Sequence, residues 1–143
     1  MNRHKTLHRI TVAVAGVFVL SLALGCGARV PADPLQAKAW EHGIEILGVQ
    51  VMGNGEFALL NYRVVDYEKA KRSLKNDVQL AAEGSDRPLP IASTSRLGLL
   101  RQRPTAGGRR QFMMFTNSGH TLQKGGRAWL KIGTSRLEGI PVS

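Results

Sequence analysis

GIEILGVQVMGNGEFALLNYRVV, residues 43–65, is the stretch that most clearly predicts the fold. Apolar and polar residues alternate on both sides of the central Gly53-Asn54-Gly55, as they do in strands with one buried face. Because Asn and Gly tolerate a positive φ, the tripeptide predicts the turn of a β-hairpin. The alternation changes phase at Leu47-Gly48, which predicts a bulge in the first strand.

Similar short apolar runs, separated by turn residues, follow the hairpin to the C-terminus. Further strands are expected at 77–83, 111–116, 127–133 and 137–142, with short apolar pieces at 89–91 and 97–100. Pro90 cannot donate to a ladder, so its piece is expected at a sheet edge. About seven short strands favour an all-β class, specifically a single antiparallel, immunoglobulin-like β-sandwich. A small barrel is the alternative.

Two segments read as helices rather than strands. Asp33 is a suitable N-cap, Pro34 suits the first helical position, and Gly43 suits the end of a short helix. An extended lead-in strand is the alternative for this segment. Asp66 is a second suitable cap, and the helical turn or two that it begins would carry the chain from one sheet to the other.

The N-terminus has the pattern of an export signal. The first nine residues contain Arg3, Lys5 and Arg9 and no acid, and an uncharged, largely apolar run follows from Ile10 to Leu24. A helix needs roughly 20 apolar residues to span a bilayer, so a permanent transmembrane helix is the weaker interpretation.

The end of that run, Leu22-Ala23-Leu24-Gly25-Cys26, resembles the lipobox of bacterial lipoproteins. The resemblance implies that the Cys26 thiol receives a diacylglycerol, that the signal is cut before Cys26, and that the new amino terminus is acylated. Residues 1–25 would then be removed, residues 26–42 would form the lipidated cysteine, linker and short helix, and residues 43–143 the β domain. Gly27 at the next position favours, by the same resemblance, sorting to the outer membrane. An ordinary signal peptide with a stray cysteine is the alternative.

Charge narrows the range of partners beyond the membrane itself. Without residues 1–25 the chain has 17 basic and 10 acidic residues, a net charge of +7. From Arg87 onward there are ten basic residues and one acid, Glu138. This favours anionic envelope components: phospholipid headgroups, lipopolysaccharide phosphates, acidic glycans or an acidic protein face. Nucleic acid is not an expected partner of an exported protein.

The loop at 101–110 is the best candidate for an anion-binding site. It contains Arg101, Arg103, Arg109 and Arg110 together with a proline and two glycines, a composition typical of an exposed loop. Guanidinium groups bind phosphate or carboxylate oxygens in pairs. The alternative is a solvated basic loop that only keeps the protein soluble.

Nothing in the sequence predicts a catalytic residue, a metal site or a cofactor. The motifs of hydrolases, metalloproteases and nucleotide-binding enzymes are absent. His120 has hydroxyl side chains near it in the sequence, and a hydrolase that uses His120 is one alternative hypothesis. Copper handling is another alternative, because thioether and imidazole groups are soft enough to bind Cu(I). The available ligands would be Met52, Met113, Met114, His42 and His120. Met113 and Met114 are neighbours on one predicted strand and would point to opposite faces.

Two further segments, 62–70 and 112–119, with 122–125 after the second, are similar to an uncharacterised group of secreted and lipid-anchored proteins of Gram-negative bacteria. The resemblance covers roughly residues 43–142 and implies a location and a β fold, and no activity. The function expected from the sequence is therefore that of a lipid-anchored envelope protein whose domain binds or scaffolds and does not catalyse.

Overall fold

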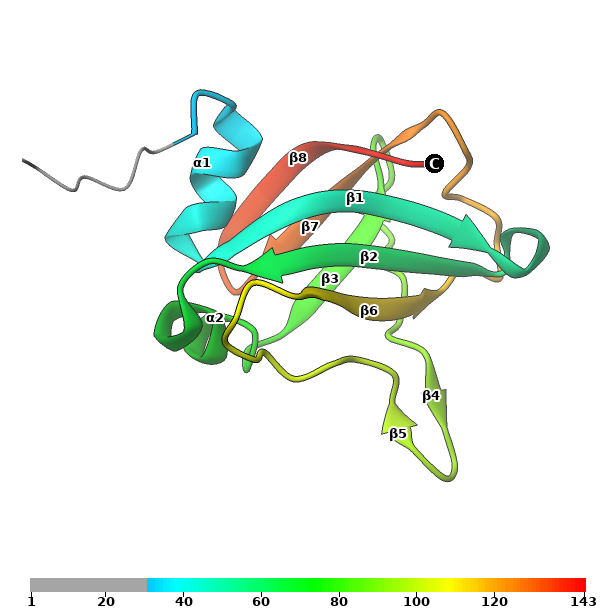
Figure 1. Ribbon diagram of the computed structural model, residues 1–143. Helices are drawn as coiled ribbons and strands as arrows, with labels where there is room; N and C mark the ends of the chain where they lie inside the picture. The colour runs from blue at the N-terminus through cyan, green and yellow to red at the C-terminus, as the bar shows by residue number, and fades with distance from the viewer. Residues whose placement is uncertain (1–30) are drawn as a thin grey trace, which may run out of the picture.

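The computed structural model describes residues 31–143. The predicted signal peptide, its cleavage site and Cys26 lie outside the described residues. The elements in chain order are α1 (Pro34–Glu41), β1 (Ile44–Met52), the 3₁₀ turn η1 (Gly53–Gly55), β2 (Phe57–Val64), α2 (Tyr67–Ser73), β3 (Val78–Ala82), β4 (Ser93–Thr94), β5 (Gly98–Leu99), β6 (Arg110–Thr116), β7 (Arg127–Ile132) and β8 (Ser135–Pro141) (Figure 1). Strands predominate, so the predicted all-β class is confirmed. Neither helix is long and apolar enough to cross a membrane, as far as residues 31–143 are concerned.

The strands form two three-stranded antiparallel sheets, ordered β1-β2-β6 and β3-β7-β8, and a two-stranded ribbon of β4 and β5. One sandwich of seven strands is therefore not confirmed. Backbone hydrogen bonds also join the two larger sheets at both of their edges. At one edge Val49 of β1 bridges Val142, just after β8, in a parallel sense.

The other edge is closed by residues 89–92, which lie between β3 and β6. The Leu89 amide donates to the Leu80 carbonyl at 2.7 Å, and the Ala92 amide donates to the Met114 carbonyl at 2.8 Å. This segment was expected at a sheet edge, but it pairs on both sides. Pro90 takes part through its carbonyl, which accepts a hydrogen bond from the Thr116 amide, so its missing N–H does not prevent the pairing. The strands thus enclose a single core, an arrangement closer to the small-barrel alternative than to an open sandwich.

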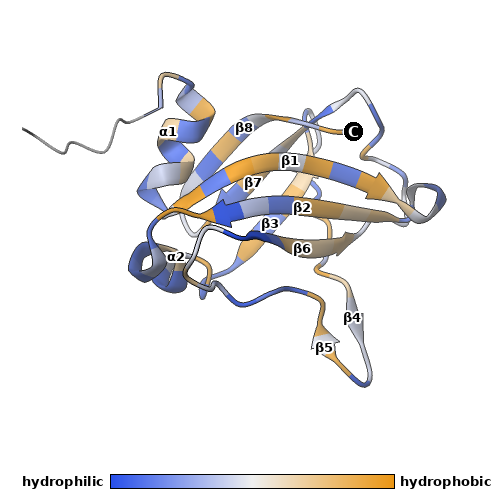
Figure 2. Cartoon of the chain, in the orientation of Figure 1, coloured by the Kyte–Doolittle hydropathy of each residue, from blue (hydrophilic) through white to orange (hydrophobic). Residues whose placement is uncertain are grey.

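The β1–β2 hairpin has the predicted form. Asn54 in its turn has φ +55°, and the register shifts between Ile46 and Gly48, where the bulge was expected. Along β2 the alternate residues Ala58, Leu60, Tyr62 and Val64 are buried. Figure 2 shows the matching alternation of apolar and polar residues along β1. Burial of these apolar faces in the shared core stabilises the fold by about 25 cal/mol per Å² of apolar surface.

Both predicted helices are present with their predicted caps. Asp33 accepts a hydrogen bond from the Leu35 amide at 2.9 Å, and Asp66 accepts one from the Lys69 amide at 3.1 Å. Gln36 of α1 binds the open edge of β1: its amide nitrogen donates to the Ile46 carbonyl at 2.7 Å, and its oxygen accepts from the Ile46 amide at 3.0 Å. One side chain therefore satisfies a strand edge where no strand pairs.

The β4–β5 hairpin projects from the body of the domain (Figure 1). Within the apolar piece at 97–100, Gly98 and Leu99 form β5 of this hairpin and belong to neither of the larger sheets. Leu97 is 76 % exposed and Leu99 is 52 % exposed. The chain returns to the body at Arg101, which bridges Met113 of β6.

Candidate anion-binding site

A cleft of about 490 Å³ lies between α2 and the segment 101–104. Arg101 and Arg103 line it from that segment, and Lys71 and Lys75 line it from the side of α2. No carboxylate is among the residues that line this cleft. The cleft therefore presents four cations to any molecule that enters it.

A second, smaller hollow of about 400 Å³ adjoins the first, because Gln102 and Arg103 line both. Arg109 and Arg110 belong to this second hollow. All four arginines that the sequence proposed are thus gathered in one continuous region. We call the basic face the set of six cations that line these two hollows, namely Lys71, Lys75, Arg101, Arg103, Arg109 and Arg110.

Backbone and side-chain hydrogen bonds hold the segment that carries these arginines against β6. The Gln102 amide donates to the Phe112 carbonyl at 3.0 Å. The buried Tyr62 hydroxyl donates to the Gln102 carbonyl at 3.2 Å. Farther along, the Gln111 side chain donates to the Thr105 carbonyl at 3.2 Å. The loop at 101–110 is therefore attached to the sheet at several points.

Tyr62 shows how closely the core and the basic face are connected. Burial raises the pKa of Tyr62 to about 12, and the nearby charge of Arg101 opposes this rise. The Arg101 guanidinium also donates to the Leu74 carbonyl at 3.4 Å, which connects it to the end of α2. Arg110 donates to the side-chain oxygen of the buried Asn61 at 3.0 Å. These contacts orient the guanidinium groups without neutralising them.

The basic face has no acidic counterpart in the described part of the chain. The ion pairs found there are Arg63–Glu45, Lys69–Asp66 and Arg136–Glu138, at 2.8, 3.7 and 3.0 Å. None of them includes a member of the basic face. Figure 2 shows that α2 and the start of β6, which carry part of the basic face, are hydrophilic. Gathering like charges is unfavourable, and a bound anion would relieve that repulsion.

Sequence reasoning missed the two lysines of this site. Lys69, Lys71 and Arg72 after Asp66 are exposed, as expected of a solvated helical face, and Lys71 lines the cleft as well. Lys71 lies on α2 and Lys75 in the turn that follows it, and both line the cleft. The fold brings both lysines next to the arginine segment, which lies 26 residues or more farther along the sequence.

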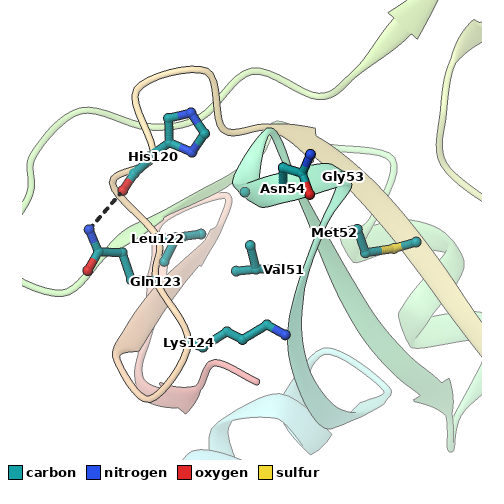
Figure 3. A pocket seen from close by; sticks show the side chains of 9 residues that line it. Val51, Met52, Gly53, Asn54, His120, Leu122, Gln123 and Lys124 are labelled. Carbon is teal, nitrogen blue, oxygen red and sulfur yellow. Dashed lines mark hydrogen bonds between the residues drawn. The ribbon is translucent and has the colours of Figure 1, made fainter.

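The side chains proposed for copper are not gathered in one place. Met52 and His120 line a common hollow beside the hairpin turn, but Figure 3 shows the Met52 side chain directed away from His120. Met113 is buried in the core, while Met114 is half-buried on the opposite face of β6. His42 lies just before β1 and His120 beside the turn after it, so the strand separates them. Within residues 31–143 no three His, Cys, Asp or Glu side chains are grouped closely enough to hold a metal ion.

His120 has no catalytic partner in the region that the structure describes. Its backbone has φ +49°, and its ring lies against Gly55, where an added Cβ would be 2.5 Å from Nδ1. The described hydrogen bonds include none between this ring and a hydroxyl. His42, in contrast, lies 3.3 Å from the Ser73 hydroxyl through Nδ1, a pairing that the sequence did not suggest. Burial lowers the pKa of His42, and the negative charge of Glu41 partly offsets this shift. The Nε2 atom of His42 is buried and has no hydrogen-bond partner among the described residues. This contact joins the ends of the two helices.

Comparisons with known proteins do not assign this chain to a family. No family model, no curated protein and no solved structure matches the chain.

Proposed function

We propose that this protein is a lipid-anchored component of the bacterial cell envelope whose β domain binds or scaffolds, and that the basic face contacts an anionic envelope component. The anchor is proposed on Cys26, at the outer membrane, with the domain on the periplasmic side. The proposal of an anchor rests on the basic N-terminus, the apolar run and the lipobox-like Leu22–Cys26. The proposal of an anionic partner rests on the structure.

The observation that carries the anionic partner is the convergence of six cations on two adjoining hollows without a carboxylate in either lining. Three separate segments contribute to it: α2 with the residue pair that follows it, the segment 101–104, and the start of β6. The three segments lie toward one end of the β1–β2 hairpin, the end at which both helices lie (Figure 1).

The arrangement of the chain fits a tethered domain of this kind. α1 is the first element of the described chain and shares that end of the hairpin with α2, through the His42–Ser73 contact. A short linker before Asp33 would hold this end near a membrane surface. An anionic leaflet attracts each nearby cation by about 1 kcal/mol, so the basic face would add to the lipid anchor.

Binding to anionic vesicles tests the proposed contact. All helices, all strands and the shared core of the described chain lie at or after Pro34, so a soluble fragment from residue 31 keeps every contact described above. We expect it to sediment with phosphatidylcholine vesicles that contain phosphatidylglycerol and not with pure phosphatidylcholine. Binding is expected to weaken as salt is raised, because salt screens exposed charges.

Two matched variants locate the contact. The first replaces Arg101, Arg103, Arg109 and Arg110 by Gln. The second replaces four exposed cations outside the basic face, Arg87, Arg96, Lys124 and Lys131, by Gln, and so changes the net charge equally. The first is expected to abolish most vesicle binding and the second to leave most of it. Equal losses in the two variants would refute a localised basic face. The anchor is tested separately, by incorporation of labelled palmitate that disappears in Cys26→Ser.

A further inference from the structure

The cleft between α2 and the segment 101–104 is more than a group of cations, because four of the nine residues that line it are apolar. The lining includes Tyr67, Leu74, Pro104 and Met113 beside the four charged residues. Leu74 and Met113 are buried members of the core, so the apolar surface open to a ligand comes from Tyr67, which is 37 % exposed, and from the half-buried Pro104. An inorganic anion would leave this apolar part of the cleft uncovered.

The charged and apolar parts of the cleft lie next to each other. The Lys71 ammonium lies 5.7 Å from the centre of the Tyr67 ring. The Arg101 guanidinium donates to the carbonyl of Leu74, whose side chain lines the same cleft. A cation that contacts a ring or a backbone carbonyl still has donors to spare for a ligand, since an ammonium has three and a guanidinium five.

From this combination we infer that the cleft binds one molecule of an anionic amphiphile, with a phosphate group held by the cations and the adjoining aliphatic part packed against the Tyr67 side of the cleft. The inference rests on the proposed function and names the class of ligand. A phosphate suits the site because it accepts several charge-assisted hydrogen bonds at once, including paired bonds from arginine. A purely polar acidic glycan would satisfy the cations and leave the apolar lining in contact with water.

The volume of the cleft limits how much of the ligand is enclosed. A site of about 490 Å³ is in the range of pockets for small ligands, and a whole phospholipid with two long chains would not fit. The cleft would therefore hold the headgroup phosphate and the first part of a chain. The rest would remain in the bilayer, so binding would orient this end of the domain toward the membrane.

Soluble short-chain lipids test the inference on the fragment from residue 31. Three probes are titrated by calorimetry below the concentration at which they form micelles: dihexanoyl-phosphatidylglycerol, dihexanoyl-phosphatidylcholine and glycerol 3-phosphate. The first has an anionic phosphate and chains, the second has chains without net charge, and the third has phosphate without chains. We expect the first to bind about tenfold or more tightly than either of the others.

Variants separate the two parts of the site. Lys71→Gln with Lys75→Gln is expected to weaken dihexanoyl-phosphatidylglycerol binding by roughly tenfold, because two charge-assisted contacts are lost. Tyr67→Ser is expected to weaken the same probe several-fold and to leave glycerol 3-phosphate unchanged. Lys124→Gln with Lys131→Gln is the matched control and is expected to change neither. Thermal melting confirms that each variant is folded.

Equal affinity for dihexanoyl-phosphatidylglycerol and glycerol 3-phosphate would overturn the inference, because the apolar lining would then contribute nothing. No binding of the short-chain lipid, with vesicle binding that still depends on the four arginines, would overturn the inference and leave the proposed function standing. Vesicle binding that is insensitive to those arginines would instead refute the proposed function.

Discussion

Asn117 holds the loop after β6 to the hairpin turn, and its replacement by Ala should strongly destabilise the domain. Its side chain is fully buried and makes four hydrogen bonds. The amide nitrogen donates to the carbonyls of Gly55 and Leu122, at 2.7 and 3.0 Å. The oxygen accepts from the Leu122 amide at 3.1 Å and from the Thr121 hydroxyl at 3.3 Å. Every donor and acceptor of this amide is therefore used.

The magnitude follows from the groups left behind. Asn117→Ala leaves the amide and the carbonyl of the buried Leu122, and the carbonyl of the half-buried Gly55, without these partners. An unsatisfied buried polar group costs about 1 to 3 kcal/mol, and water reaching Gly55 would reduce its share. We expect a loss of about 2 to 4 kcal/mol in the free energy of unfolding. For a domain of this size that lowers the melting temperature by roughly 10 to 15 °C.

Urea unfolding followed by circular dichroism measures the loss, and two variants act as controls. Ser118→Ala changes the exposed neighbour and is expected to alter stability by less than about 0.5 kcal/mol. Asn117→Asp keeps the acceptor for Leu122 but places a carboxylate oxygen against two carbonyls, so it should be more destabilising at neutral pH than when protonated. If Asn117→Ala lies within about 1 kcal/mol of the wild type, the reasoning from buried, fully bonded polar groups is wrong for this loop.

Four further predictions concern other parts of the domain. Gln36→Ala should cost about 1 to 3 kcal/mol and speed hydrogen exchange of the Ile46 amide, because the Gln36 side chain makes both of the hydrogen bonds to the Ile46 backbone at that edge. Unchanged exchange would contradict this. Gly55→Ala should destabilise the hairpin turn for two reasons: φ at this position is +96°, and the new Cβ would meet the His120 ring. Adding His120→Ala should remove the clash but not the backbone strain, so thermal melting should show only a partial recovery. Burial lowers the pKa of His42, so as the pH falls this histidine is protonated in the unfolded chain before it is protonated in the fold. The contribution of His42 to the free energy of unfolding should be full above about pH 6.5 and decline below it, and the decline should be weaker in His42→Gln. The pH dependence from Tyr62 has the opposite sign, because folding raises the pKa of Tyr62 to about 12: its contribution to stability should be full below about pH 10 and be lost as the pH rises through 12. Tyr62→Phe should remove this dependence and cost about 1 kcal/mol, because the hydrogen bond to the Gln102 carbonyl is lost.

The helices and the first hairpin were predictable because their determinants are local. Asp33 and Asp66 cap helices through hydrogen bonds that span two or three residues, and Gly53-Asn54-Gly55 adopts backbone angles set by those residue types. The bulge near Gly48 was visible as a change of phase over a few positions. Short-range interactions of this kind do not depend on which distant segment packs nearby.

The errors came from pairings between distant segments. Residues 89–91 were expected at an edge because Pro90 cannot donate a hydrogen bond. They nevertheless connect β3 with β6, because Leu89 bonds to β3 while the Pro90 carbonyl and Ile91 pair with β6. Leu97 and Leu99 belong to an apolar piece of the sequence and are nevertheless exposed, because the hairpin that carries them projects from the body (Figure 1). Hydrophobic character predicts a preference for burial and does not say which segments find partners.

For the site, the sequence by itself indicated a positively charged C-terminal half, four arginines in one loop and a lipobox-like cysteine whose role stays a prediction. It also determined that Met113 and Met114 would lie on opposite faces of a strand, because the period of a strand is two. Only the tertiary structure placed Lys71 and Lys75 beside Arg101 and separated His42 from His120. The physical reason is that charge and periodicity are properties of neighbouring residues, whereas a cleft is formed by elements whose contact is decided by packing across the whole core.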